Sequence, residues 1–166
     1  ILREAAEQPG RTAALVSPDR LLARRVAIRL EAWGIRVDDS AGRPFAKTVP
    51  GAFLDLAVET QRTGFAPAPL MALLKHPLTR LGLGAFDARR AARALEIAVF
   101  RDVYLGRGLD GVAHGLARAA IDVASGKRRL RTARRLWEED WQLARDLVAR
   151  LTAAFQPLEI LFRNNR

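Results

Sequence analysis

The stretch that decides the fold runs from Arg11 to Pro44 and reads RTAALVSPDRLLARRVAIRLEAWGIRVDDSAGRP. Its first part, residues 12–16, is an apolar run of strand length. Ser17 and Pro18 then offer an N-cap oxygen and a residue suited to the first turn of a helix. This order predicts a strand that passes directly into a helix.

The helix that follows is predicted by the spacing of its apolar residues. They recur at intervals of four, four and three, which places them on one face: Leu22, Val26, Leu30 and Trp33. Gly34 supplies the left-handed residue that commonly ends a helix. Residues 35–37 are a second short apolar run, so the stretch predicts a unit with two parallel strands and one helix between them.

The remainder of the chain predicts helices. A helix end at 2–8 stops at Pro9-Gly10, and Thr48 caps a helix that runs to about Arg62. Further helices are expected at 70–75, from Asp87 to about Leu105, from 112 to about 123 and from 138 to Pro157, with one more turn at 78–81. We therefore expect a mainly α protein with a small two-stranded α/β unit at residues 1–44 and a helical part at residues 45–166.

The last of these helices has the clearest periodicity. Its apolar residues repeat at intervals of four and three: Trp137, Trp141, Ala144, Val148, Leu151 and Phe155. Glu138, Glu139 and Asp140 stand in its first turn, where the helix dipole favours negative charge. The three tryptophans of the chain, Trp33 among them, lie on predicted apolar faces and are expected in the core.

Composition limits the classes of protein to which the chain can belong. The 166 residues contain no cysteine, which excludes disulfides, thiolate zinc sites and iron–sulfur ligands within them. No apolar run reaches the roughly 20 residues that span a bilayer, so we expect a cytoplasmic protein without membrane contact. The chain lacks an initiator methionine, and we interpret it as an internal fragment of a larger protein.

The candidate catalytic patterns lack the neighbouring residues or the secondary structure that their chemistry needs. Gly106, Gly108 and Gly111 have the spacing of a dinucleotide-binding motif, but a helix and not a strand precedes them. Asp38 and Asp39 follow a predicted strand without a third ligand nearby, and His76 and His114 lack a nucleophile or metal-binding partner. The sequence thus predicts no catalytic, cofactor-binding or metal-binding residue, and no enzymatic activity of the chain itself.

Positive charge is the strongest chemical signal. The formal net charge is +10, and nearly all the basic residues are arginines, which suit bidentate phosphate contacts. Six basic residues crowd into residues 127–135: Lys127, Arg128, Arg129, Arg131, Arg134 and Arg135. A second basic surface is expected on the first helix, on the side away from Leu22, Val26 and Leu30: Arg20, Arg24, Arg25 and Arg29. Both are candidate nucleic-acid contacts, although a solvated linker and a generally basic composition explain the same residues.

The opening stretch resembles the beginning of the second RecA-like domain of superfamily 1 DNA helicases. The residues that carry the resemblance are Ala14, Leu15, Val16, Arg20, Leu21, Leu30, Gly34, Ile35, Gly42, Pro44, Thr48, Gly51, Phe53 and Leu54. Three phrases, DDSAGRP at 38–44, LLKHPL at 73–78 and EEDW at 138–141, make the chain similar to AddB, the helicase-like and nuclease subunit of the AddAB (RecBCD-like) break-repair complex, in its alphaproteobacterial type.

The resemblance implies a parent protein that processes double-strand DNA ends for recombination. Such a parent is a subunit of an ATP-dependent exodeoxyribonuclease and helicase, uses ATP and magnesium, carries an iron–sulfur cluster in some members and pairs with an AddA-like subunit. The family's nucleotide-binding loop, nuclease carboxylates and cluster cysteines have no counterparts in these residues. The resemblance therefore implies a structural or DNA-contacting role for the chain, with DNA as its expected partner.

Two other readings compete with this one. A helical protein–protein interaction module without a nucleic-acid role would use the amphipathic stretch from Trp137 to Phe155 to bind its partner. A small enzyme would use Asp38 and Asp39 at the end of a strand. Self-association is also expected if the predicted strands leave an open edge that a second copy of the chain covers.

Overall fold

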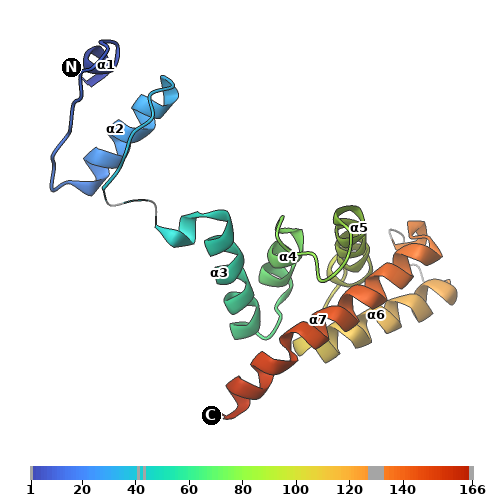
Figure 1. The fold of residues 1–166 in the computed structure, drawn as a ribbon. Coiled ribbons are helices and arrows are strands. Elements are labelled where there is room, and N and C mark those ends of the chain that lie inside the picture. Colours follow the sequence, from blue (N-terminus) through green and yellow to red (C-terminus); the bar gives the residue numbers. More distant parts are fainter. Residues whose placement is uncertain (1, 41, 43, 127–132, 165–166) are drawn as a thin grey trace. The chain divides into compact units, whose positions relative to one another are not determined.

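The computed structural model describes residues 2–40, 42, 44–126 and 133–164, with side chains as far as residue 158. Its described elements are helical, which confirms the prediction of a mainly α protein (Figure 1). The chain divides into two compact units, Ile1–Pro44 and Phe45–Arg166.

The first unit contains helices α1 (Leu2–Ala6) and α2 (Arg20–Ala32). Asp19, and not Ser17, caps α2, because its side chain accepts hydrogen bonds from the backbone N–H groups of Leu21 and Leu22 at 2.9 and 3.1 Å. Gly34 follows the helix with φ +74°, as predicted for a residue that ends a helix.

The two predicted strands are not confirmed. Residues 12–16 and 35–37 are irregular, and no backbone hydrogen bond joins them in the part of the chain that the structure describes. Residues 13–16 and 35–37 line the same groove along one side of α2, but they do not form a strand ladder. The physical reason is that two short parallel strands are unstable alone and need further strands beside them.

The second unit begins with the turn η1 (Phe45–Lys47) and helix α3 (Val49–Arg62). Thr48 caps α3 as predicted, since its Oγ1 accepts a hydrogen bond from the Gly51 N–H at 3.1 Å. Gly64 follows with φ +62°. Helix α4 (Pro67–Lys75) comes next and ends at His76, in agreement with the prediction that the residue before Pro77 would interrupt it. Residues 78–81, predicted as a helical turn, are not helical.

The helix expected from Asp87 to Leu105 ends earlier in the structure, and its last turn is π-helical. Helix α5 (Ala85–Leu95) passes into the π-helical turn η2 (Glu96–Phe100), which closes with a hydrogen bond from the Arg101 N–H to the Glu96 carbonyl at 3.0 Å. Residues 103–107 are irregular, so the prediction that a helix extends to Leu105 is wrong. The five-residue spacing of the π turn breaks the register on which the prediction depended.

Two long helices complete the unit. Helix α6 (Gly108–Ala124) begins earlier than predicted, and α7 (Glu138–Asn164) follows the short turn η4 (Ala133–Arg135). Pro157 lies inside α7 and does not end it, which corrects the prediction. A proline removes one helical hydrogen bond, but the helix can resume beyond it.

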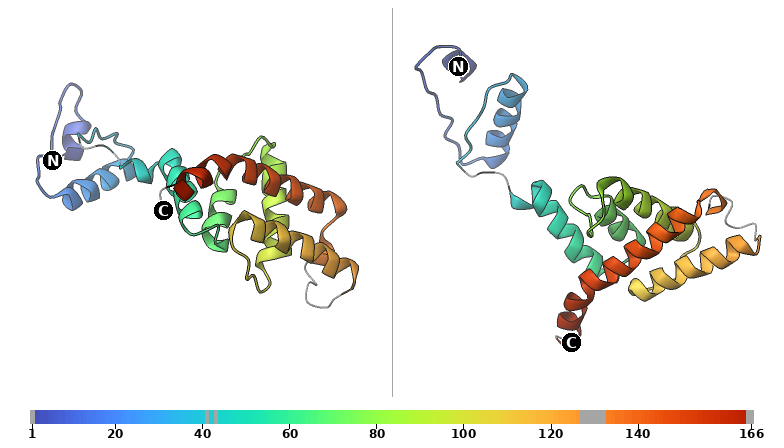
Figure 2. Two further views of the ribbon diagram at one scale, coloured as in Figure 1. Left: turned by 90° about the horizontal axis from the view of Figure 1, so that it is seen from below. Right: turned by 45° about the vertical axis from the view of Figure 1, so that its right-hand side comes forward.

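The core of the second unit is formed where α7 packs against α5 and α6 (Figure 2). Helix α5 contributes mostly alanines to it, namely Ala88, Ala91, Ala92 and Ala94, followed by Leu95. Small side chains let a neighbouring helix approach closely. From α7, Trp141, Ala144, Leu147, Val148, Leu151 and Phe155 are buried, so the predicted apolar face of this helix is used inside the unit. Trp137 is the exception, because it is 75% exposed.

Candidate functional site

The predicted arginines of α2 are exposed, but they do not form a separate basic face. Arg25 and Arg29 line a shallow groove together with Leu22, Val26 and Ile28, whereas Arg24 lies outside that groove. The opposite side of the helix, with Leu30 buried, faces the irregular segments of its own unit. Two arginines are therefore interleaved with apolar side chains, which differs from the prediction that charge and apolar residues occupy opposite faces.

These arginines are available for an external anion. Among the residues described, no carboxylate forms an ion pair with Arg24, Arg25 or Arg29. Many other arginines of the chain are paired, for example Arg3 with Glu7, Arg62 with Glu59 and Arg145 with Glu138 at 2.6–2.8 Å. Hydrogen bonding to Glu59 raises the pKa of Arg62 and lowers that of Glu59, as expected for such a pair.

The second predicted basic segment is described only at its end. Lys127, Arg128, Arg129 and Arg131 lie outside the described residues. Arg134 and Arg135 belong to η4 and are exposed, and Arg134 donates a hydrogen bond to the backbone carbonyl of Gly126. The two basic groups belong to different units of the chain.

The residues considered for catalysis are not brought together. His114 is exposed on α6, where its Nδ1 lies 2.7 Å from the Asp110 carbonyl, and the ring of His76 packs on Phe53 with a centroid separation of 5.6 Å. Asp38 and Asp39 lie along the groove of the first unit. Within the described residues, no three histidine or acidic side chains are grouped in a way that could hold a metal ion.

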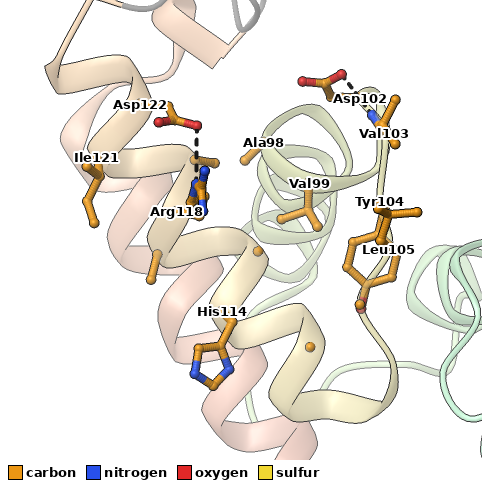
Figure 3. Close-up of a pocket in the computed structure, with 15 residues that line it drawn as sticks. Ala98, Val99, Asp102, Val103, Tyr104, Leu105, His114, Arg118, Ile121 and Asp122 are labelled. Atoms are coloured by element: carbon orange, nitrogen blue, oxygen red, sulfur yellow. Dashed lines mark hydrogen bonds and ion pairs between the residues drawn. The ribbon is translucent and has the colours of Figure 1, made fainter.

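A groove that the sequence did not indicate runs between α6, η2 and residues 102–106. Its volume is about 790 Å³, which is in the range of ligand-binding clefts. Small residues form much of the wall, including Ala98, Val99, Gly111, Gly115 and Ala119. Figure 3 shows α6 on one side and the segment that carries Val103, Tyr104 and Leu105 on the other, with Val99 between them.

Tyr104 is the most unusual side chain of this groove. Its ring packs edge-on against Phe100, with 5.1 Å between the ring centroids, and its buried hydroxyl has no hydrogen-bond partner among the described residues. Burial raises the pKa of the Tyr104 hydroxyl. Glycines make this position possible, since a Cβ atom at Gly106 or Gly111 would lie only 2.7 or 3.1 Å from the hydroxyl oxygen. Two of the glycines that resembled a dinucleotide motif therefore pack against a tyrosine.

Charged residues of both signs line the groove alongside the apolar ones. Arg118 and Asp122 form an ion pair at 3.8 Å on α6, and the Asp102 carboxylate accepts a hydrogen bond from the Val103 N–H at 2.8 Å. No nucleophile with an adjacent base is present among these residues. The arrangement can bind an apolar surface, but it offers no evident chemistry.

Sequence reasoning missed this groove because it placed residues 96–105 in a continuous helix. That prediction put Val103 and Tyr104 inside a helix, whereas both belong to an irregular segment and Val103 is exposed. The combination of three glycines in residues 106–111 with an aromatic residue just before them was the available signal for a tight non-helical packing.

No protein-family model matches the chain, and no match was found among the curated proteins or the solved structures. Among the described residues, none of the helices combines the length and apolar character needed to cross a bilayer.

Proposed function

We propose that the chain is a DNA-holding part of an AddB-like subunit of a double-strand break repair complex, without catalytic activity of its own. The observation that carries the proposal is the set of exposed arginines on α2, Arg24, Arg25 and Arg29, for which the described residues supply no ion-pair partner. Arginines of this kind contact phosphates without reading base sequence.

The proposal also accounts for the irregular segments of the first unit, where the predicted strands are not formed. Residues 13–17 and 35–40 line one groove along α2, and their backbones lack strand partners in the described chain. In the proposed parent these segments are strands of a larger RecA-like sheet whose other strands come from elsewhere. The parent works in the cytoplasm with ATP, magnesium and an AddA-like partner, none of which binds through residues identified in this chain.

The test measures binding of the protein to a fluorescently labelled duplex DNA end by anisotropy at increasing salt. We expect the affinity to fall steeply between about 50 and 200 mM salt, because bound arginines release counterions from the phosphates. A triple variant, Arg24→Gln, Arg25→Gln and Arg29→Gln, is expected to weaken binding at least about tenfold and to reduce the slope of log K against log salt by about two to three.

A matched control changes three arginines that are already paired with carboxylates: Arg3→Gln, Arg62→Gln and Arg145→Gln. It removes the same net charge, so it separates a local contact from general electrostatic attraction. Salt-independent binding by the wild type would contradict the proposal. Equal losses of DNA affinity in the two triple variants would show that the arginines of α2 have no special role in binding.

The competing interaction module is not favoured in its predicted form. The apolar residues of α7 from Trp141 to Phe155 are buried against the unit's own helices, so they do not offer a free surface.

A further inference from the structure

The outer face of α5 carries the one aromatic residue of that helix together with exposed arginines. The face of α5 that packs into the core is lined mostly by alanines. Phe86, by contrast, is 75% exposed, and Arg89 and Arg93 follow it at intervals of three and four and are exposed as well. Residues at these spacings are neighbours on a helix, so the ring and the two guanidinium groups form one row. Asp87, the acidic residue of α5, lies about 100° around the helix from Phe86.

A second exposed aromatic ring lies beside this row. Trp137, which directly precedes α7, is 75% exposed. Asp140 joins it to α5, because its carboxylate accepts hydrogen bonds from the Trp137 backbone N–H at 2.8 Å and from Arg90 Nε at 2.5 Å. Arg90 stands one turn after Phe86 and one turn before Arg93, so Trp137 borders the same surface. This aromatic–arginine surface consists of Phe86, Arg89, Arg93 and Trp137.

The acidic residues in the first turn of α7 are balanced by arginines. Arg90 pairs with Glu139 and Asp140 at 3.2 and 2.5 Å, and Arg145 pairs with Glu138 at 2.6 Å. Other arginines at the surface, or two residues before Trp137, form no ion pair within the described parts of the chain: Arg89, Arg93 and Arg135. The charge that is left for an external partner is therefore positive.

We propose that the aromatic–arginine surface binds a single strand of nucleic acid, with bases stacked on Phe86 and Trp137 and phosphates on Arg89 and Arg93. Every base has a flat face that can stack on an exposed ring, and cationic side chains beside the rings attract the backbone that joins the bases. The bases of a duplex are already stacked on one another, so they are not accessible in this way. Charged residues separate the two rings, so the surface is not the continuous apolar patch that a protein partner covers.

This inference does not rest on the proposed contact of α2 with DNA, because that contact uses phosphates alone and belongs to the other unit. The experiment measures anisotropy of the full chain with a labelled oligothymidylate of about 12 nucleotides. An abasic strand of the same length serves as comparison, since it has the phosphates and no bases. We expect the wild type to bind oligothymidylate at least about tenfold more tightly than the abasic strand. An oligouridylate of the same length shows whether DNA or RNA is the preferred strand.

Substitutions separate the rings from the charges. Phe86→Ala and, independently, Trp137→Ala should weaken binding to oligothymidylate about tenfold and leave binding to the abasic strand unchanged, because each removes a stacking ring and no charge. Arg89→Gln combined with Arg93→Gln should weaken binding to both strands and reduce its salt dependence. The matched control is Phe45→Ala, because Phe45 is 61% exposed and lies in η1, outside the surface. It should bind both strands like the wild type.

A conservative variant keeps the test valid if an alanine variant loses helix by circular dichroism. Trp137→Phe retains a ring, so it should keep most of the affinity, while the quenching of tryptophan fluorescence by oligothymidylate should be smaller than in the wild type. The triple variant of α2 should keep the preference for oligothymidylate over the abasic strand, which distinguishes failure of this proposal from failure of the proposed function. Equal affinity of the wild type for the two strands would overturn the proposal. Unchanged binding by both alanine variants at Phe86 and Trp137 would overturn it too and leave the surface to a protein partner.

Discussion

At the scale of single residues, Tyr104 shows how the second unit tolerates a polar group without a partner. The hydroxyl is buried against glycine backbone, and the described residues give it no hydrogen bond. An unsatisfied buried hydroxyl is destabilising because it has lost its hydrogen bonds to water. The ring compensates through its edge-on contact with Phe100.

We therefore expect Tyr104→Phe to leave the free energy of unfolding unchanged or to raise it by about 1 kcal/mol. Tyr104→Ala is expected to lower it by about 2–4 kcal/mol, because the aromatic contact is lost and a cavity remains. Urea unfolding followed by circular dichroism measures both. A large loss of stability in Tyr104→Phe would show that the hydroxyl has a partner.

The stability of the wild type and of Tyr104→Phe should also depend differently on pH. Burial raises the pKa of Tyr104 above the usual value of 10.0. The unfolded chain then releases this proton at lower pH than the folded chain. The contribution of the protonated hydroxyl to the free energy of unfolding is therefore complete below pH 10 and is lost as the pH rises further. Tyr104→Phe should lose less stability above pH 10 than the wild type.

At the scale of secondary-structure elements, the contact between α5 and α7 combines an apolar interface with one well-placed ion pair. Arg90 on α5 donates a hydrogen bond from Nε to Asp140 Oδ1 at 2.5 Å and lies 3.2 Å from Glu139 Oε2. The side chain of Asp140 is 11% exposed and that of Glu139 is 78% exposed. The pKa of Arg90 is raised, mainly by the hydrogen bond to Asp140 and to a smaller extent by the one to Glu139.

Two isosteric substitutions separate the buried contact from the exposed one. Asp140→Asn should lower the free energy of unfolding by about 1–3 kcal/mol, because Arg90 loses its close anionic partner and the carboxylate that accepts from the Trp137 N–H is also changed. Glu139→Gln should cost less than about 0.5 kcal/mol, as usual for an exposed pair. Chemical denaturation measures the free energy of unfolding of both variants. Equal losses would contradict the conclusion that the contact with Asp140 is the stabilising one.

Helices with a strong period and a recognisable end were predictable from the sequence. The spacing of apolar residues from Trp141 to Phe155 identified the buried face of α7, and Thr48 identified the start of α3. The π turn could not be predicted, because its extra residue per turn leaves local composition unchanged while it shifts every later residue. The groove at Tyr104 depends on that shift and was therefore missed.

The strand predictions were not confirmed for a different reason, at residues 12–16 and 35–37. Their composition suits strands, but a strand is stabilised by its neighbours and not by its own sequence. Within the described chain they have no such neighbours. The arginines of α2 were correctly expected to be exposed, yet their mixture with Leu22 and Val26 depends on which side of α2 its own unit covers.

At the scale of the whole molecule, the two units differ in what holds them together. The hydrophobic core consists of residues between Phe65 and Phe155, all in the second unit. Among the described residues of the first unit, Leu30 is the one buried hydrophobic side chain, while Leu21, Leu22, Ile28 and Trp33 are exposed. Because apolar burial is the main stabilising contribution to folding, nearly all the stability should reside in residues 45–166.

This difference predicts that residues 45–166 fold without the first unit. Expressed alone, they should unfold cooperatively in urea at the same midpoint as the full chain, within experimental error, because no residue of the core is removed. Residues 1–44 alone should show no cooperative transition, since a unit of this size with one buried leucine cannot offset its loss of conformational entropy. Limited proteolysis of the full chain should cleave first within residues 1–44 and leave a stable fragment that begins near residue 45. A midpoint lowered substantially by the deletion would show that the first unit contributes to the stability of the second.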